Sequence, residues 1–196
     1  MKIDTDRLTI TEFRTDMAQA VHENSLDGEN RRFLPDEVFE TTEEAEDTIR
    51  FLMSRYGGTD GPLVYPVLLK DGTQIGHVQA VPAGNGEWEA GWHIGSRYTK
   101  KGYATEAVAA FLPVIMRQLG IDRISGICAA ENTASRRVME KCGFIPEYEG
   151  NGDYQGKQAT ICRWQYFKDG GCSARPEKDG GDFRNTVSPE GGGRTD

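Results

Sequence analysis

Long apolar runs are missing from this 196-residue chain, and its first residues, Met1 to Asp4, carry charged side chains where a signal peptide would be apolar. A transmembrane helix needs about 20 predominantly apolar residues, and a secretory signal needs an apolar central segment. We therefore expect neither a membrane partner nor export, and we predict a cytoplasmic protein.

Cysteine is also scarce, and the residues stand singly at Cys128, Cys142, Cys162 and Cys172. Zinc sites built from thiolates usually contain closely spaced cysteine pairs, so we expect no metal site. Buried, reduced thiols and one thiol in the C-terminal tail are the simpler interpretation for a cytosolic protein.

Basic residues are outnumbered, with 23 Lys and Arg against 31 Asp and Glu, which gives a net charge of −8. General nucleic-acid binding requires a basic face, so we expect no nucleic-acid partner. The acidic balance suits an amine-bearing partner, but it is equally a common aid to solubility. Charge alone therefore decides no function.

Large apolar side chains almost disappear after residue 168. Residues 169–196 are rich in Gly, Pro and charge, with Phe183 and Val187 as the only large apolar residues. Such a stretch cannot bury enough apolar surface to offset the entropy of ordering it. The sequence predicts one domain over residues 1–168 and a flexible tail over 169–196, because the chain is too short for two comfortable domains.

Residues 1–168 contain patterns typical of strands and helices in alternation. Apolar alternation predicts strands, and apolar residues at intervals of three and four predict helices. The predicted strands cover 7–13, 63–69, 74–81, 87–94, 123–130, 147–154 and 159–167. The predicted helices lie near 17–21, over 41–56, and over 103–119 and 133–142. This order predicts an α/β protein with a mixed sheet and helices on both faces.

A glycine and two lysines precede the longest predicted helix, in the segment Thr99 to Ala104 with the sequence TKKGYA. A helix N-terminus presents about four unpaired amide groups and roughly half a unit of positive charge. Gly102 and Ala104 keep side chains away from an approaching phosphate, and the lysines add charge. The segment is therefore a candidate diphosphate site, although a loop with two solvated lysines would have the same sequence.

Four segments together resemble the GNAT acyl-coenzyme A N-acyltransferases. TKKGYATEA is similar to the signature Arg/Gln-x-x-Gly-x-Gly/Ala, with Thr99 at the Arg/Gln position. NTASRRVMEKCGF, from Asn132 to Phe144, resembles a later helix of the family. TDRLTITEF and EAGWHI resemble strands of the branch that contains the ribosomal-protein-alanine N-acetyltransferases. The resemblance covers about residues 5–168 and implies a mostly antiparallel, twisted GNAT sheet of six to seven strands.

The resemblance implies acetyl-coenzyme A as cosubstrate and an amine as acceptor. The diphosphate would bind the amides of Lys101 to Thr105, and the pantetheine arm would pair with a splayed strand edge near Trp92 to Gly95. The implied cofactor-binding residues are His93, Ile94, Lys100, Lys101, Gly102, Tyr103, Ala104, Thr105 and Asn132. Asn132 equally suits a plain helix N-cap.

Two residues are the catalytic candidates. Glu89 resembles the strand glutamate of the branch and would accept the proton of the acceptor amine, directly or through water. His93 is a second candidate base on the same face of the strand. Ser135 would donate a proton to the departing thiolate, because Met139 occupies the position where many family members have tyrosine. Tyr154 is an alternative donor.

Several alternatives stay open at this stage. The acceptor is either a protein N-terminus or a small-molecule amine, with Phe33 and Tyr56 as candidate lining residues. Exposed strand edges and the family resemblance are compatible with a homodimer. Because Thr99 and Met139 depart from the family pattern, a catalytically inactive acyl-coenzyme A binding or sensing module is the alternative function.

Overall fold

The computed structural model describes residues 1–168, apart from the side chains of residues 29 and 30. The predicted tail, residues 169–196, lies outside the described residues. Within the described residues, no helix combines the length and apolar character that crossing a bilayer requires.

One sheet of eight strands organises the described chain, in the order β1-β2-β3-β4-β5-β6-β8-β7. All neighbours are antiparallel except β5 and β6, which are parallel because α4 crosses over between them. The strands are β1 (Ile3–Asp4), β2 (Leu8–Ile10), β3 (Leu63–Leu69), β4 (Gln74–Gly84), β5 (Glu87–Ile94), β6 (Arg123–Ala129), β7 (Ile145–Tyr154) and β8 (Lys157–Phe167).

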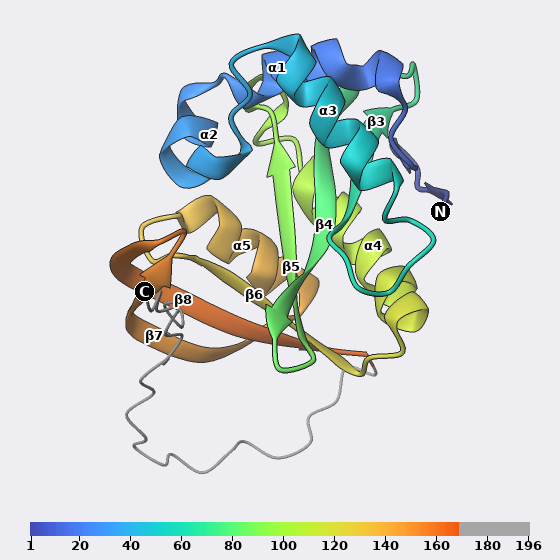
Figure 1. Ribbon diagram of the computed structural model, residues 1–196. Coiled ribbons are helices and arrows are strands. Elements are labelled where there is room, and N and C mark those ends of the chain that lie inside the picture. Colours follow the sequence, from blue (N-terminus) through green and yellow to red (C-terminus); the bar gives the residue numbers. More distant parts are fainter. Residues whose placement is uncertain (169–196) are drawn as a thin grey trace, which may run out of the picture.

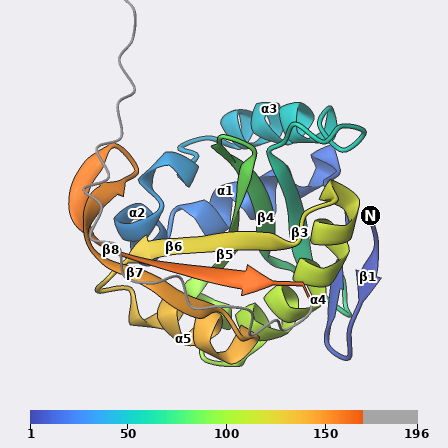
Figure 2. The same ribbon diagram turned by 90° about the horizontal axis from the view of Figure 1, so that it is seen from below.

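Helices cover both faces of the sheet, as predicted, with α4 and α5 on one face and α1 and α3 on the other (Figures 1 and 2). The α-helices are α1 (Ala18–Ser25), α2 (Gly28–Phe33), α3 (Thr42–Met53), α4 (Tyr103–Leu119) and α5 (Thr133–Cys142). The 3₁₀ helices are η1 (Thr15–Met17), η2 (Pro35–Glu37) and η3 (Ser96–Tyr98).

The core is divided by the sheet into two apolar clusters. The larger lies under α4 and α5 and includes Phe111 and Ile115. The smaller lies under α1 and α3 and includes Ile49 and Val64. Trp88 is buried in the larger cluster, and Trp92 and Trp164 pack against it, as their alternate strand positions predict. On the second face of β4 and β5, most side chains are polar.

The predicted strand count of six to seven was too low. The additional strand, β1, pairs with β2 through only two residues, which is too short to show alternation. The first predicted strand, residues 7–13, is also shorter in the structure, because Phe13 leaves the sheet to pack in the smaller cluster.

Candidate active site

β5 and β6 pair at one registered position and then separate. The two strands share one registered pair, Glu89 with Ser125, whereas β5 pairs with β4 along its full length. Figure 1 shows β5 and β6 running in different directions. The Gly95 amide donates to the Ile75 carbonyl of β4 at 2.9 Å. Because amide directions alternate along a strand, the amides of Trp92 and Ile94 point toward the β5–β6 gap.

The loop between β5 and α4 turns through two left-handed residues. Lys100 has φ +62° and Gly102 has φ +82°, and Gly102 is the N-cap of α4 without a capping side chain. The first-turn amides of α4 therefore have no side-chain acceptor at the N-cap and face the mouth of the loop. Thr99 closes the preceding turn, since its hydroxyl donates to the Ser96 carbonyl at 2.9 Å. The residue at the Arg/Gln position of the signature is thus engaged with backbone.

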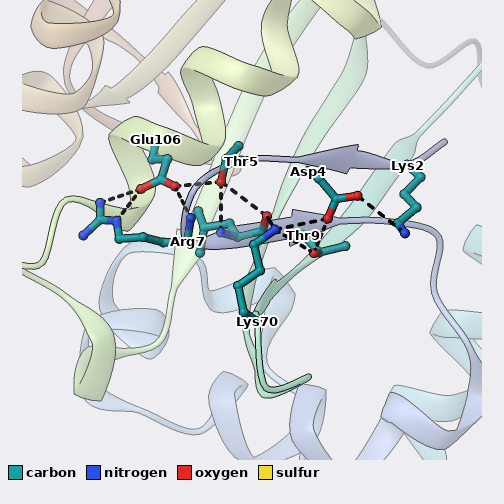
Figure 3. A network of polar contacts seen from close by, with 8 residues as sticks. Lys2, Asp4, Thr5, Arg7, Thr9, Lys70 and Glu106 are labelled. Atoms are coloured by element: carbon teal, nitrogen blue, oxygen red, sulfur yellow. Dashed lines mark hydrogen bonds and ion pairs between the residues drawn. The ribbon is translucent and has the colours of Figure 1, made fainter.

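The N-terminal segment is bound to the first turn of α4 (Figure 3). Arg7 Nε donates to Glu106 Oε2 at 2.6 Å, and the Thr5 hydroxyl donates to Glu106 Oε1 at 2.6 Å. Another guanidinium nitrogen of Arg7 donates to the Lys101 carbonyl at 2.9 Å. Burial would raise the pKa of Glu106, but the hydrogen bonds from Thr5 and Arg7 and the Arg7 charge lower it. The loop is therefore held at Lys101 and at Glu106 by the same side chain.

Glu89 extends from the face of β5 opposite to the larger apolar cluster. Burial raises its pKa to about 7, and the charge of Arg163 on β8 partly offsets this rise. Tyr154 lies in the same region, and its hydroxyl donates to the Phe33 carbonyl at 3.2 Å. Burial raises the pKa of Tyr154 to about 12, with further contributions from Cys128, Glu89 and Glu37. This part of the site therefore combines a carboxyl group that titrates near neutrality with a protonated phenol.

A cavity of about 300 Å³ opens on the sheet face covered by α1 and α3. Its sheet wall includes His77, Gln79 and Val81 of β4 and His93 of β5. The register opposes His77 to His93, Gln79 to Gly91, and Val81 to Glu89. A Cβ atom at Gly91 would lie 2.7 Å from Gln79 Nε2, so glycine leaves the space that the Gln79 amide occupies. Glu89 is thus the cross-strand neighbour of a lining residue.

Glu37 of η2 joins the two histidines into one polar cluster. Its carboxylate contacts His77 Nε2 at 3.1 Å and accepts a hydrogen bond from Gln79 Nε2 at 3.1 Å. Burial would raise the pKa of Glu37, but His77, His93 and Gln79 lower it. The rings of His77 and His93 are 5.6 Å apart. Burial, reinforced by His77, lowers the pKa of His93 to about 4, so its imidazole is neutral near pH 7.

Asn132 and Ser135 both lie at the N-terminus of α5. Asn132 is the N-cap, and its side chain accepts from the Ser135 amide at 3.1 Å. Ser135 is in the first turn and half-buried. Met139 is fully buried in the larger cluster. Its position therefore belongs to the core, and it supplies no proton donor.

The expected pocket residues Phe33 and Tyr56 are not among those that line this cavity. Tyr56 stacks on Tyr65, with ring centroids 4.9 Å apart, and its hydroxyl donates to the Val64 carbonyl at 2.6 Å. The Tyr56 hydroxyl thus forms hydrogen bonds with backbone groups of Val64 and Phe13, and its ring packs against both core clusters. Phe33 contributes its carbonyl to Tyr154, and its ring lies beneath the Arg32 guanidinium.

Sequence reasoning missed the polar cluster around Glu37. Alternation along β4 would have placed His77 and Gln79 on one face, across from His93, so part of the signal was present. Nothing in the pattern around Glu37 indicated that it would reach these residues, because η2 is three residues long and has no apolar period. Arg7 was missed because its partner is 99 positions away in the chain.

Comparison with known proteins assigns this arrangement to a family. A model described as acetyltransferase (GNAT) domain matches residues 7–145, which is more than half of the chain. The chain belongs to the GNAT acetyltransferase family. The chain is also similar to the uncharacterized N-acetyltransferase YnaD of Bacillus subtilis (strain 168), with 37% identity over 149 residues that span 75% of this chain and 84% of YnaD.

Solved GNAT structures share the fold. The crystal structure of a GNAT-family acetyltransferase from Bacillus anthracis matches this structure with a TM-score of 0.73 and 28% sequence identity. The match covers 86% of this chain and 99% of the Bacillus anthracis chain. The structure of RimL, a ribosomal L7/L12 alpha-N-protein acetyltransferase in complex with coenzyme A, matches with a TM-score of 0.72 and 17% sequence identity. The match covers 87% of this chain and 100% of the RimL chain. At that identity, RimL supports the fold alone. The predicted family and fold class are confirmed.

Proposed function

We propose that this GNAT protein transfers the acetyl group of acetyl-coenzyme A directly to a primary amine. The observation that carries the proposal is the β5–β6 gap, which opens beside Glu89 and leads to the left-handed loop before α4. One edge of the gap offers strand amides, and the loop offers helix-terminal amides. This combination suits a carrier with an amide-containing arm and a diphosphate.

The loop before α4 would hold the diphosphate. Lys100, Lys101 and Gly102 are exposed, and the amides from Lys101 to Thr105 belong to the loop end and first helical turn. The Trp92 and Ile94 amides would pair with the pantetheine arm, as an added strand would. One of these amides is also the candidate donor to the thioester oxygen as negative charge develops there, an interaction typically worth about 3 kcal/mol.

Glu89 is the better candidate base. The attacking amine must lose a proton, and each pKa unit between donor and acceptor costs about 1.4 kcal/mol. With pKa values of about 7 for Glu89 and about 4 for His93, proton uptake by Glu89 is less unfavourable by about 4 kcal/mol. A base that titrates near the working pH is also the efficient one.

The remaining proton transfer is to the leaving group. Attack of the amine nitrogen on the thioester carbonyl forms a C–N bond, and cleavage of the C–S bond releases coenzyme A thiolate, which needs a proton. Ser135, on the first turn of α5, stays the proposed donor. Tyr154 is the alternative, since its raised pKa keeps its proton available at neutral pH.

The alternative function is a coenzyme A binding module without catalysis, since Met139 takes the place of a tyrosine donor. The test combines calorimetry with acetyl-coenzyme A and thiol release in the presence of a panel of amines. We expect binding and amine-dependent release. Binding without release across peptides and small amines would favour the module, and absence of binding would refute both functions.

A further inference from the structure

The cavity beside β5 has an apolar end and a polar end. Val64 of β3 and Ile49 and Leu52 of α3 line one end, while Gln79 of β4 and His93 of β5 line the other. The strands follow one another as β3-β4-β5-β6 in the sheet. The polar end is therefore next to the β5–β6 gap, and the apolar end is farthest from it. An occupant that reacts at the gap would point its apolar part away from the gap.

The charged groups of the cavity are acidic. Among the described residues that line it are two carboxylates, Asp36 and Glu37, and neither lysine nor arginine. Glu37 is half-buried whereas Asp36 is exposed, and the lowered pKa of Glu37 keeps it ionised. His93 is neutral near pH 7 because burial lowers its pKa to about 4. The polar end of the cavity thus presents the Glu37 carboxylate, which His77 contacts, and the neutral imidazole of His93.

Two amide side chains are shared by this cavity and a second cavity that arginines line. Asn24 Nδ2 donates to Gln74 Oε1 at 2.8 Å, and both residues line the cavity. They also line a second cavity, of about 320 Å³, which contains Arg14 and Arg97. Arg14 and Arg97 line the second cavity and not this one, so among the described residues this cavity offers an anionic group no lysine or arginine. Its basic side chains are His77, already in contact with Glu37, and the neutral His93.

From this layout we propose that the acceptor is a small primary amine with one apolar group and no carboxylate or phosphate, such as an arylalkylamine. This inference rests on the proposed function and narrows its substrate class. The ammonium group would enter at Glu37 and His93, and the apolar group would fill the end formed by Ile49, Leu52 and Val64. The volume is at the lower limit for ligand pockets, about 300 Å³, which suits a single ring or a short chain.

The charge argument sets a direction for selectivity. A carboxylate on the α-carbon of the amine would lie against the ionised Glu37, and the repulsion between two like charges held this close has a cost in binding. A neutral substituent of the same size lacks this cost. Selectivity between charged and neutral analogues therefore reports Glu37, while selectivity between large and small amines reports the apolar end.

The experiment measures kcat/KM by thiol release with the full chain at saturating acetyl-coenzyme A. The three matched acceptors are 2-phenylethylamine, phenylalaninamide and phenylalanine. We expect phenylalanine to be poorer than 2-phenylethylamine by at least about 100-fold, and phenylalaninamide to stay within about tenfold. Equal use of phenylalanine, or faster acetylation of a peptide N-terminus than of any small amine, would overturn the substrate class.

Two variants separate charge from size. Glu37→Gln should collapse the preference for 2-phenylethylamine over phenylalanine to about tenfold or less. Val21→Phe, which narrows the cavity from α1, should lower kcat/KM for 2-phenylethylamine at least about tenfold and change n-propylamine little. Unchanged acetyl-coenzyme A affinity in calorimetry serves as the folding control for both. An unchanged charge preference in Glu37→Gln would overturn the role of Glu37.

The two proposals fail in different ways. If the protein acetylates peptides or amino acids but not 2-phenylethylamine, the substrate class is wrong and the acetyltransferase activity stands. If it acetylates no amine at all, the proposed function is wrong. In that case calorimetric titration with 2-phenylethylamine and phenylalanine still tests the cavity, and equal or absent binding of the two refutes the inference.

Discussion

The guanidinium of Arg7 binds the carboxylate of Glu106 in the first turn of α4 and also donates to the carbonyl of Lys101 in the preceding loop. It also stacks over the Tyr103 ring, with its carbon 4.7 Å from the ring centroid. One side chain from the N-terminal segment therefore holds the loop at Lys101. It also neutralises Glu106 (Figure 3), an acidic group at the helix end where the diphosphate is proposed to bind.

Arg7→Ala should weaken acetyl-coenzyme A binding more than it slows the chemical step. Without Arg7, the Glu106 carboxylate would repel the diphosphate. We expect KM for acetyl-coenzyme A to rise about tenfold with little change in kcat, and the free energy of unfolding to fall by about 2 kcal/mol. Initial-rate kinetics and urea unfolding measure the two effects.

The double variant Arg7→Ala/Glu106→Gln identifies the cause. Removal of the uncompensated carboxylate should restore most of the affinity if repulsion is responsible. Arg50→Ala is the matched control, since Arg50 pairs with Glu46 on α3. A fall in stability with an unaltered KM would show that Arg7 has a purely structural role.

Gly102→Ala and Gly120→Ala form a matched pair at the two ends of α4. Both glycines have positive φ, +82° and +67°, so alanine at either position should cost about 1 kcal/mol of stability. Only Gly102 lies at the proposed diphosphate site. We expect calorimetry to show weaker acetyl-coenzyme A binding for Gly102→Ala alone, whereas equal losses in both variants would indicate a general effect of destabilisation.

The sequence was sufficient for those features that depend on local pattern. The helix over 103–119, its glycine at each end and the Asn132 cap were predicted, because each is specified within a few residues. Features formed by residues far apart in the chain were not predicted. Glu37 meets His77 from 40 positions away through a three-residue 3₁₀ helix, and no periodicity encodes that approach.

Glu89→Gln should abolish the pH dependence of the rate near neutrality. Because Glu89 has a pKa of about 7, kcat/KM of the wild type should rise with pH through about 7 as the carboxylate forms. The variant should be slower by about 10²- to 10⁴-fold and lack this inflection. Glu87→Gln, on the same strand and paired with Arg123, is the control. Retention of the wild-type profile in Glu89→Gln would assign the base to another group.

His93 should make the fold sensitive to acid. Its folded-state pKa of about 4 is below the ordinary value of 6.5, so the unfolded state binds more protons between these two values. Stability present above pH 6.5 is therefore lost as the pH falls toward 4, by up to about 3 kcal/mol. His93→Gln should flatten this part of the urea-unfolding profile. A profile parallel to that of the wild type would mean that His93 titrates normally.

Glu89 should act in the opposite direction and over a higher range. Its pKa rises from an ordinary 4.5 to about 7, so the folded state binds more protons than the unfolded state between these values. The contribution is fully present below pH 4.5 and is lost as the pH rises through about 7, by up to about 3 kcal/mol. Glu89→Gln cannot ionise, and it should therefore be more stable than the wild type at pH 8 and closer to it at pH 5. Urea unfolding at both pH values measures the difference, with Glu87→Gln as control. Equal stability of Glu89→Gln and wild type at pH 8 would show that the carboxylate ionises without cost, and the argument for Glu89 as a base tuned to neutral pH would then lose its physical foundation.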